Sequence, residues 1–293
     1  MHKPKLGIIC VEQDKKTDKK LFNSLQEKFE IILFPIQKDI DFSEMKLKAK
    51  DISLVLNNAA YWPITYDSLE IAKTFEGLGK KVIDSTNSLY YHEDKWMFYQ
   101  TCLKHKLPTP TTYFIPFDIL SSPGKLKEII SSGPLVFKSV LSELGKAVKL
   151  ARNYKSSLKI IENLHKSTEH MPMIAQKYIP HGKVSYRITM MGNKIIQGVI
   201  KYGKNWKEGK LFWKNEKYRL FKPDRKLVSL CRKTAKAFGI DWCGIDLMKD
   251  SDGKWYLIEI NSCPGMDFIV KDIDRMNKEL ANYLLNVQGK ISR

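Results

Sequence analysis

The chain has 293 residues, of which 43% are hydrophobic, and its 50 basic against 32 acidic residues give a formal net charge of +18. This length and apolar content exclude a disordered polypeptide, and no apolar run approaches the roughly 20 residues of a membrane-spanning helix, so we expect no membrane partner. The five cysteines are scattered without a CxxC pair, which argues against a disulfide framework or a zinc site and favours a reducing cytoplasm.

The first 90 residues alternate between two kinds of segment. Short apolar runs typical of strands occupy residues 6–11, 31–34, 52–56 and 81–83, and segments typical of helices occupy residues 18–29 and 68–78. Strands that alternate with helices predict a parallel α/β sheet. The run at 6–11 is too short for a signal peptide, and no GxGxxG follows it, which argues against a dinucleotide site there.

A second unit is predicted over residues 91–175. Its expected helices cover residues 93–105 and 157–165, and its expected strands cover residues 135–140, 147–150 and 173–179. Pro108 and Pro110 follow the first of these helices and end it. A polar turn that includes Ser142 and Gly145 separates the first two strands.

A third unit is predicted over residues 176–293. Strands at residues 184–191 and 194–202 are joined by the turn Gly192-Asn193, and an amphipathic helix over residues 225–238 is closed by Gly239. A hairpin follows, and a last helix is expected over residues 273–287.

The hairpin carries three side chains with oxygen ligands. Asp246 lies in its first apolar run, and Glu259 and Asn261 lie two residues apart in its second, so these two point to the same face. The turn signal Asp250-Ser251-Asp252-Gly253 separates the runs. Two carboxylates and an amide oxygen suit Mg²⁺, which takes few protein oxygens and completes its shell with water and phosphate. The alternative is an exposed hairpin with ordinary solvated acids.

These features follow one another in an order that resembles a known superfamily. In chain order they are Asp94-Lys95, Lys138 before a Ser/Gly turn, the strand end Gln176 to Ile179, Arg187, and the set Asp246, Glu259 and Asn261. This order resembles the ATP-grasp superfamily, and most closely the RimK-type carboxylate–amine ligases. The resemblance implies an α/β ATP-grasp fold. An N-terminal Rossmann-like pre-ATP-grasp domain would cover residues 1–90, a small central lobe residues 91–175, and a C-terminal lobe with the metal site residues 176–293.

The resemblance assigns several residues to ATP. Lys95 and Lys138 match lysines that contact the ATP phosphates, and lysine serves as a point charge for phosphate. The turn with Ser142 and Gly145 resembles the glycine-rich loop that closes over the phosphates through backbone N–H groups. Gly145 is the only glycine of this turn and Glu143 adds a negative charge, so the turn departs from the family pattern. Solvated lysines and an ordinary β-turn are the alternatives.

A second ATP-binding segment is implied at the end of a strand. Gln176, Lys177, Tyr178 and Ile179 resemble the hinge whose backbone pairs with the adenine edge. In the family, the side chains matching Tyr178 and Ile179 help to line the base pocket. The alternative is a plain buried strand end.

Two basic residues match positions that face the reacting groups. Arg187 matches the arginine of the family's D-x-R segment, and a guanidinium can hold a carboxylate or phosphate with two bonds. Ser185 replaces the acid of that segment, and Lys201 stands where many relatives have an arginine that faces the acyl phosphate. Lysine keeps the charge but loses the forked geometry. Residues 206–221 replace the family's Gly-Gly segment where acceptor recognition is expected, which indicates a different substrate. The alternative is that Arg187 and Lys201 are ordinary surface cations.

The resemblance implies an ATP-dependent ligase that forms a carbon–nitrogen bond. In the family, the positions of Asp246, Glu259 and Asn261 hold two Mg²⁺ ions, with Mn²⁺ as a possible substitute, against the phosphates. ATP phosphorylates a substrate carboxylate, and an amine attacks the acyl phosphate to form an amide or peptide bond. The expected partners are small-molecule or peptide carboxylates and amines, and ligases of this family are often dimers or tetramers.

The positive charge is uneven along the chain. Residues 194–236 contain fourteen Lys or Arg against the three acids Glu208, Glu216 and Asp224, and aromatic residues are interleaved with them. Such a stretch favours acidic partners, so one hypothesis is an acidic substrate such as a glutamate-containing peptide. A solvated lysine-rich surface is the alternative.

Two other functions stay open at this point. An ATP-binding protein without ligase activity would explain the glycine-poor turn, Ser185 and Lys201, although the intact metal ligands argue against it. A nucleic-acid-binding protein would explain the charge, but no helix-turn-helix, zinc-finger or RNP-like motif supports that function.

Overall fold

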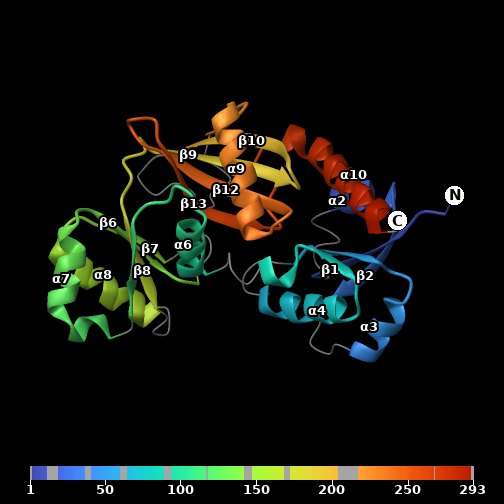
Figure 1. Ribbon diagram of the computed structural model, residues 1–293, viewed down its shortest axis with the longest axis horizontal. Coiled ribbons are helices and arrows are strands. Elements are labelled where there is room, and N and C mark those ends of the chain that lie inside the picture. The colour runs from blue at the N-terminus through green and yellow to red at the C-terminus, as the bar shows by residue number, and fades with distance from the viewer. Residues whose placement is uncertain are drawn as a thin grey trace.

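In the computed structural model (Figure 1), the residues that the structure describes form three sheets. The structure describes residues 2–11, 19–36, 41–59, 65–88, 94–116, 118–141, 147–167, 172–203, 217–266 and 268–291. The sheets follow one another along the chain, and helices pack against each of them. The prediction of an α/β fold is confirmed.

The first sheet is parallel, with the strand order β2-β1-β3-β4. Successive residues of β1 are buried on opposite faces: Ile8 lies in one cluster with Phe22, whereas Ile9 lies in another with Phe75. Both faces are covered, which explains the nearly continuous apolar runs of the strands. The elements are β1 (Lys5–Cys10), α2 (Lys19–Gln26), β2 (Glu30–Pro35), α3 (Phe42–Lys48), β3 (Leu54–Asn57), α4 (Thr65–Gly77) and β4 (Lys81–Ile83).

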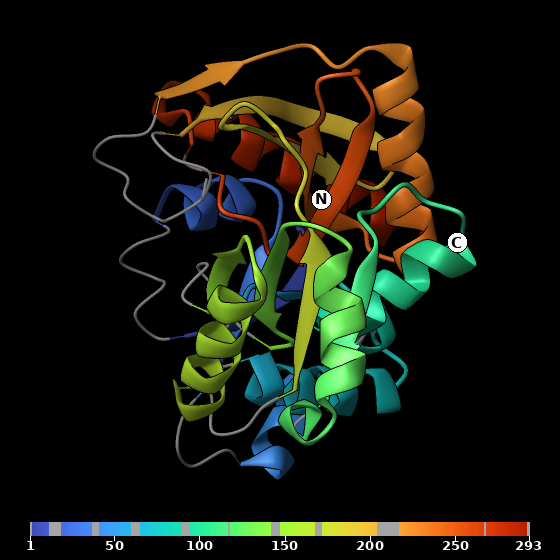
Figure 2. The same cartoon turned by 90° about the vertical axis from the view of Figure 1, so that its left-hand side faces the viewer.

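The second sheet is antiparallel, with the strand order β5-β8-β6-β7. Its helices α7 and α8 face the viewer in Figure 2, and Leu126 of α7 and Ile161 of α8 are buried in one cluster with Phe137 of β6. Lys138 is the next residue along β6 and therefore points away from that cluster. The elements are β5 (Thr112–Ile115), α7 (Pro123–Ser131), β6 (Leu135–Ser139), β7 (Val148–Ala151), α8 (Tyr154–Ser167) and β8 (Met173–Lys177).

The third sheet is antiparallel, with the strand order β11-β10-β9-β12-β13. Helices α6 and α9 cover one face, where Phe98 and Phe238 stack with ring centroids 5.3 Å apart. Ile188 and Ile245 belong to that buried cluster, so the residues that alternate with them point to the opposite face. The elements are α6 (Lys95–Lys104), β9 (Val184–Met191), β10 (Lys194–Tyr202), β11 (Lys217–Leu220), α9 (Arg225–Phe238), β12 (Trp242–Lys249) and β13 (Trp255–Ser262).

Helix α10 (Ile273–Ile291) and Asp84 both connect the first sheet to the third. Helix α10 lies beside α2, and its Leu284 is buried in the same cluster as Leu21 and Trp242 (Figure 1). Asp84, just after β4, accepts hydrogen bonds from the backbone N–H groups of Asp241 at 2.6 Å and Trp242 at 3.1 Å, where β12 begins. None of the helices in the described ranges is long and apolar enough to cross a membrane.

Most of the predicted elements agree with the structure, and the bounds predicted for β4, β9, β10 and α9 match it. Strand β8 ends at Lys177 rather than at residue 179, because the backbone N–H of Tyr178 donates to Pro134 outside the strand ladder. Helix α3 was not predicted, and its single buried residue, Met45, explains why no apolar periodicity marks it. Strands β5 and β11 and helix α7 were also not predicted. The domain bounds at residues 90 and 175 stay a prediction.

We expect Asp84 to make stability depend on pH. Burial raises the pKa of Asp84 from 3.8 to about 7, although the N–H groups of Asp241 and Trp242 oppose the rise. The folded state thus favours the protonated form, whose stabilising contribution is complete below pH 3.8 and is lost as the pH rises through about 7. The two pKa values correspond to about 4 kcal/mol of unfolding free energy.

In urea denaturation, Asp84→Asn should therefore lose less stability than the wild type between about pH 4 and pH 8, because the amide keeps an acceptor oxygen without the charge. Asp51→Asn is the matched control, since it removes the same charge from an exposed side chain paired with Lys5. Identical pH profiles for Asp84→Asn and the wild type would contradict the expectation.

Candidate active site

The face of the third sheet opposite α6 and α9 carries a row of charged side chains. Arg187 of β9 is directly opposite Asp246 of β12, and Asp246 is directly opposite Glu259 of β13. Residues in cross-strand register project from the same face of a sheet. Lys201 of β10 pairs with Ser185, two residues from Arg187, and so joins the row on this face.

Asp246 is the centre of this row. Its Oδ1 accepts hydrogen bonds from Arg187 Nε and Lys201 Nζ, both at 2.8 Å, and its Oδ2 accepts from Arg187 Nη2 at 2.7 Å and from Asn261 Nδ2 at 3.3 Å. Burial alone would raise the pKa of Asp246, but the charges and hydrogen bonds of Arg187 and Lys201 outweigh burial and hold this pKa below its usual 3.8. The carboxylate is therefore ionised and fully paired.

Phe268 lies against both cations of this cluster. The centroid of its ring is 5.6 Å from Arg187 Cζ and 5.4 Å from Lys201 Nζ, and its edge contacts Tyr218 of β11. Cation–π contacts of this length stabilise the cations and shield them from water. The sequence carried no signal for this role, because Phe268 is distant along the chain from both cations.

Gly244 leaves room for the Arg187 side chain. A Cβ atom at this position would lie 3.0 Å from both Cδ and Cζ of Arg187. The glycine stands two residues before Asp246 on the same strand, so it faces the same side of the sheet. The steric role of Gly244 depends on the neighbouring strand β9, which local spacing in the sequence does not identify.

The start of α6 brings Lys95 to the same place. Lys95 Nζ lies 3.5 Å from Glu259 Oε1, and the Lys95 backbone N–H donates to Val140 just beyond β6. Asp94 caps the helix by accepting from the backbone N–H groups of Trp96 and Met97. The helix start is thereby fixed between the second and third sheets.

Lys138 is buried on β6 and points into a polar chain of hydrogen bonds. Its Nζ donates to Gln176 Oε1 at 2.8 Å, and Gln176 Nε2 donates to Thr112 Oγ1 at 3.1 Å. Burial lowers the pKa of Lys138 to about 8, the charge of Glu259 opposes this, and the charge of Lys95 adds to it. Lys138 is therefore close enough to the Lys95–Glu259 pair for their charges to affect its pKa.

The predicted hinge, residues 176–179, has mixed surroundings. The backbone N–H groups of Lys177 and Tyr178 already donate to Thr111 and Pro134, whereas no described residue accepts from the N–H of Ile179. Lys177 is exposed, Tyr178 is half-buried with its ring against His181, and Ile179 is buried. The Ile179 amide is thus the hinge donor left for a ligand, and Gln176 acts through its side chain by holding Lys138.

Some predicted features lie outside the described residues. They are the turn with Ser142 and Gly145 and most of the stretch from residue 206 to residue 221. Of the basic residues in the described part of residues 194–236, Lys201 is buried in the site, whereas Lys222, Arg225, Arg232 and Lys233 are exposed.

The oxygen atoms of the hairpin fit a hard divalent cation. Asn261 turns its Nδ2 toward Asp246, so its Oδ1 faces away from that carboxylate, and within the described part of the chain Glu259 forms an ion pair only with Lys95. Carboxylate and amide oxygens are the ligands that Mg²⁺ prefers. Among the described residues no three His, Cys, Asp or Glu gather as a metal group, so water and phosphate oxygens would have to complete the shell.

Comparisons with known proteins show which family the chain resembles. A family model described as a RimK-like ATP-grasp domain matches residues 92–284. A probable alpha-L-glutamate ligase of Halorhodospira halophila is 24% identical over 234 residues, which cover 79% of this chain and 74% of that protein.

Two solved structures share the fold over nearly the whole chain. D-alanine--D-alanine ligase of Bacillus anthracis complexed with ATP has a TM-score of 0.70 and 18% identity, and the match covers 99% of this chain and 98% of that one. The ATP-grasp ligase PsnB complexed with minimal precursor, Mg and ADP has a TM-score of 0.70 and 14% identity, and the match covers 96% of each chain.

We expect Gly244→Ala to break the Asp246 cluster. The new methyl group would overlap Arg187 and push its guanidinium off the carboxylate, which leaves a buried charge with fewer partners. Chemical denaturation should show a loss of about 2 to 4 kcal/mol. Gly124→Ala is the control, because no heavy atom lies within 4 Å of the Cβ it would add. Equal stabilities of the two variants would count against the steric role of Gly244.

We also expect Lys201 to compete with a metal ion for Asp246. Its ammonium group occupies Oδ1, so Lys201→Met should tighten nucleotide-free Mn²⁺ binding by about tenfold, measured by electron paramagnetic resonance. Lys194→Met removes the same charge from an exposed residue of the same strand, paired with Glu279, and should change the affinity little. Weaker Mn²⁺ binding in Lys201→Met would contradict this competition.

Proposed function

The chain belongs to the RimK-like ATP-grasp family of carbon–nitrogen bond-forming ligases, and we propose that it joins a carboxylate to an amine through an acyl phosphate. The observation that carries this proposal is the charged row at Asp246. Arg187, Lys201 and Lys95 surround the carboxylates of Asp246 and Glu259 at 2.7 to 3.5 Å. Such a mixture of cations and metal-ligating oxygens suits a triphosphate with its metal ion.

The balance of charge at the site favours an anionic ligand. Four cations, Lys95, Lys138, Arg187 and Lys201, lie near two carboxylates, which leaves a surplus of positive charge. All four cations are largely shielded from solvent, which strengthens their interaction with a phosphate that enters the site.

Each group has a distinct role in the proposal. Lys95 and Lys138 hold phosphates of ATP, with Gln176 fixing the Lys138 ammonium group and the Ile179 amide facing the base. Asp246, Glu259 and Asn261 hold Mg²⁺. When bound, Mg-ATP supplies the phosphoryl group that activates the substrate carboxylate. Arg187 and Lys201 then neutralise the charge that develops as the amine attacks and phosphate leaves.

We further propose an acidic amino acid or peptide as substrate. The relative from Halorhodospira halophila is described as a probable alpha-L-glutamate ligase. The exposed cations Lys222, Arg225, Arg232 and Lys233 would attract such a substrate to the third sheet, although α9 carries the last three on the face opposite the charged row.

A second candidate function has one observation in its favour. Both oxygens of Asp246 are already taken by protein donors, and Lys201 is one of them. A protein that binds ATP at Lys95 and Lys138 without completing the metal site would have this arrangement. Binding of ATP without any formation of ADP across a broad set of acids and amines would favour this candidate.

The test is Glu259→Gln in an assay of ADP formation with glutamate and acidic peptides as substrates. The variant should lose at least about 100-fold in rate, because the neutral amide lacks the negative charge with which the carboxylate binds Mg²⁺, while its circular dichroism and unfolding midpoint stay close to the wild type. Glu279→Gln is the matched control, since Glu279 of α10 forms an ion pair with the exposed Lys194 of β10. Full activity of Glu259→Gln would overturn the proposed function.

A further inference from the structure

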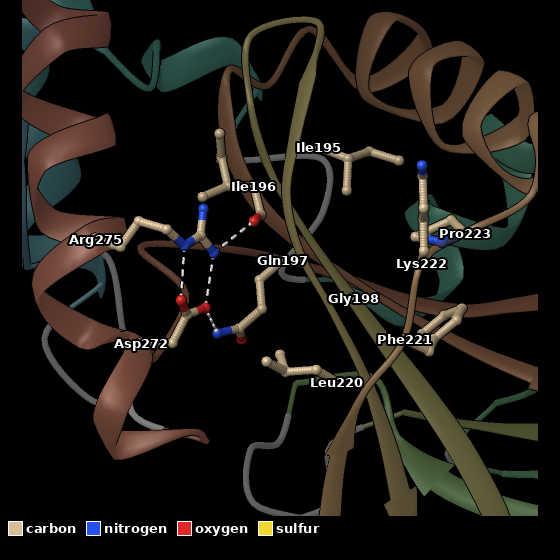
Figure 3. A pocket seen from close by; sticks show the side chains of 10 residues that line it. All are labelled: Ile195, Ile196, Gln197, Gly198, Leu220, Phe221, Lys222, Pro223, Asp272 and Arg275. Atoms are coloured by element: carbon tan, nitrogen blue, oxygen red, sulfur yellow. Dashed lines mark hydrogen bonds and ion pairs between the residues drawn. The ribbon is translucent and has the colours of Figure 1, made fainter.

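A cavity lies on the third sheet, away from the charged row. It has a volume of about 450 Å³ and opens along the edge of β10 beyond the end of β11 (Figure 3). Strand β11 pairs with β10 only over residues 199–202, and beyond β11 the Gly198 carbonyl accepts from the Phe221 backbone N–H. Residues 195–197 then form an edge, which is bordered by Lys222 and Pro223 on one side and by Asp272 and Arg275 on the other. The volume suits a ligand the size of a dipeptide.

One residue that lines this cavity, Gln197, has a buried side-chain oxygen that accepts no hydrogen bond from the described residues. Gln197 is 3% exposed, and its Nε2 donates to Asp272 Oδ2 at 2.7 Å. A carboxylate can only accept, so this bond fixes the orientation of the amide and turns its oxygen away from Asp272. Gln197 Oε1 is buried and receives no hydrogen bond from any described residue. A buried acceptor without a donor is unfavourable, and a ligand with an N–H or O–H group would satisfy it.

Asp272 does not provide that donor and is itself saturated. Arg275 Nε and Nη2 donate to its two oxygens at 2.6 and 2.7 Å, and Arg275 Nη2 also donates to the Ile196 carbonyl at 2.9 Å. Figure 3 shows these bonds converging from α10 on the edge of β10. The network fixes Gln197 in place and leaves its oxygen as the one side-chain acceptor of this network that lacks a donor.

The rim of the cavity supplies positive charge and apolar surface. Lys222 is exposed and forms no ion pair with any described residue, and Arg275 Nη1 likewise has no hydrogen-bond partner within the described part. Leu220, which is 43% exposed, and Phe221 provide an apolar wall. A ligand for this cavity thus needs a donor group, an aliphatic segment and a negative charge.

We infer that this cavity binds a short acidic peptide, with a peptide N–H donated to Gln197 Oε1 and a side-chain carboxylate paired with Lys222. The glutamyl residue combines the three features in one unit: a backbone N–H, two methylene groups and a carboxylate. Gln197 lies four residues before Lys201 on β10, about 13 Å away at 3.3 Å per residue. The cavity is therefore a binding site separate from the charged row.

The position suggests what the site does. Tyr218 and Phe268 lie beside the charged row, and the segments that carry them continue to the cavity: Leu220 follows Tyr218 by two residues, and Asp272 follows Phe268 by four. An extended peptide of about four residues would span the distance from Lys201 to Gln197. This role, holding the far end of a peptide whose other end reacts, rests on the proposed function, whereas peptide binding by the cavity does not.

The experiment is a titration of N-acetyl-glutamyl-glutamate into the full chain without nucleotide, followed by methyl NMR of Ile196 and Leu220 and by calorimetry. We expect saturable shifts of both methyl signals. Lys222→Met and Gln197→Met should each weaken binding by about five- to tenfold, and N-acetyl-glutaminyl-glutamine should bind more weakly than the acidic peptide. Lys226→Met removes the same charge from the exposed start of α9, outside the cavity lining, and should change the affinity less than twofold.

Three outcomes would overturn the inference. They are the absence of saturable binding to the wild type, an equal effect of Lys226→Met and Lys222→Met, and complete displacement of the peptide by Mg-ATP, which would locate it at the charged row. Lys222 is exposed, so its variant stays informative if Gln197→Met does not fold. Peptide binding with no ADP formation in any assay would retain the cavity and reject the proposed ligase function instead.

Discussion

The pairing of Asp246 with Arg187 and Lys201 is the interaction on which the rest of the site depends. A carboxylate on the face of a sheet can be removed from water only if cations and hydrogen-bond donors replace the lost hydration. Two strands supply these cations, β9 and β10, and both lie on one side of β12. A register slip of one residue in any of these strands would turn that strand's member of the row to the apolar face. The ion pairs of the charged row therefore help to fix the strand register of the third sheet.

The geometry of that cluster also affects what a ligand encounters. Asp246 and Glu259 are adjacent in register, yet Asp246 is fully paired, whereas the one ion pair of Glu259 with a described residue is the longer contact with Lys95. A metal ion that approaches the hairpin would meet Glu259 and the Asn261 oxygen first and would compete with Lys201 for Asp246. Since lysine holds its charge on a flexible chain, Lys201 can leave this position more readily than a forked guanidinium could.

The site combines parts of two sheets and the helix between them. Lys138 comes from β6 of the second sheet, Lys95 from the start of α6, and the charged row from the third sheet. The first sheet contacts the third through Asp84 and α10 and contributes none of the cations described for the site. Movement of the second sheet relative to the third would therefore change the distance between Lys138 and Glu259. We expect such a movement to enclose a nucleotide between the two sheets.

The sequence by itself determined the elements with strong periodicity or strong stop signals. Strands β9 and β10 were predicted because a glycine turn joins two apolar runs, and the facing of Glu259 and Asn261 followed from their spacing of two residues. The metal motif, Lys95 and Lys138 could be named because their order along the chain resembles a family.

Only the tertiary structure decided how these residues meet, because cross-strand register, burial and long-range contact are not encoded in local spacing. It placed Arg187 and Lys201 on Asp246, gave Gly244 its steric role, set Phe268 against the cations and left Gln197 Oε1 without a donor. Each of these facts joins segments that are far apart in sequence, and each depends on the packing of strands whose neighbours no local pattern identifies.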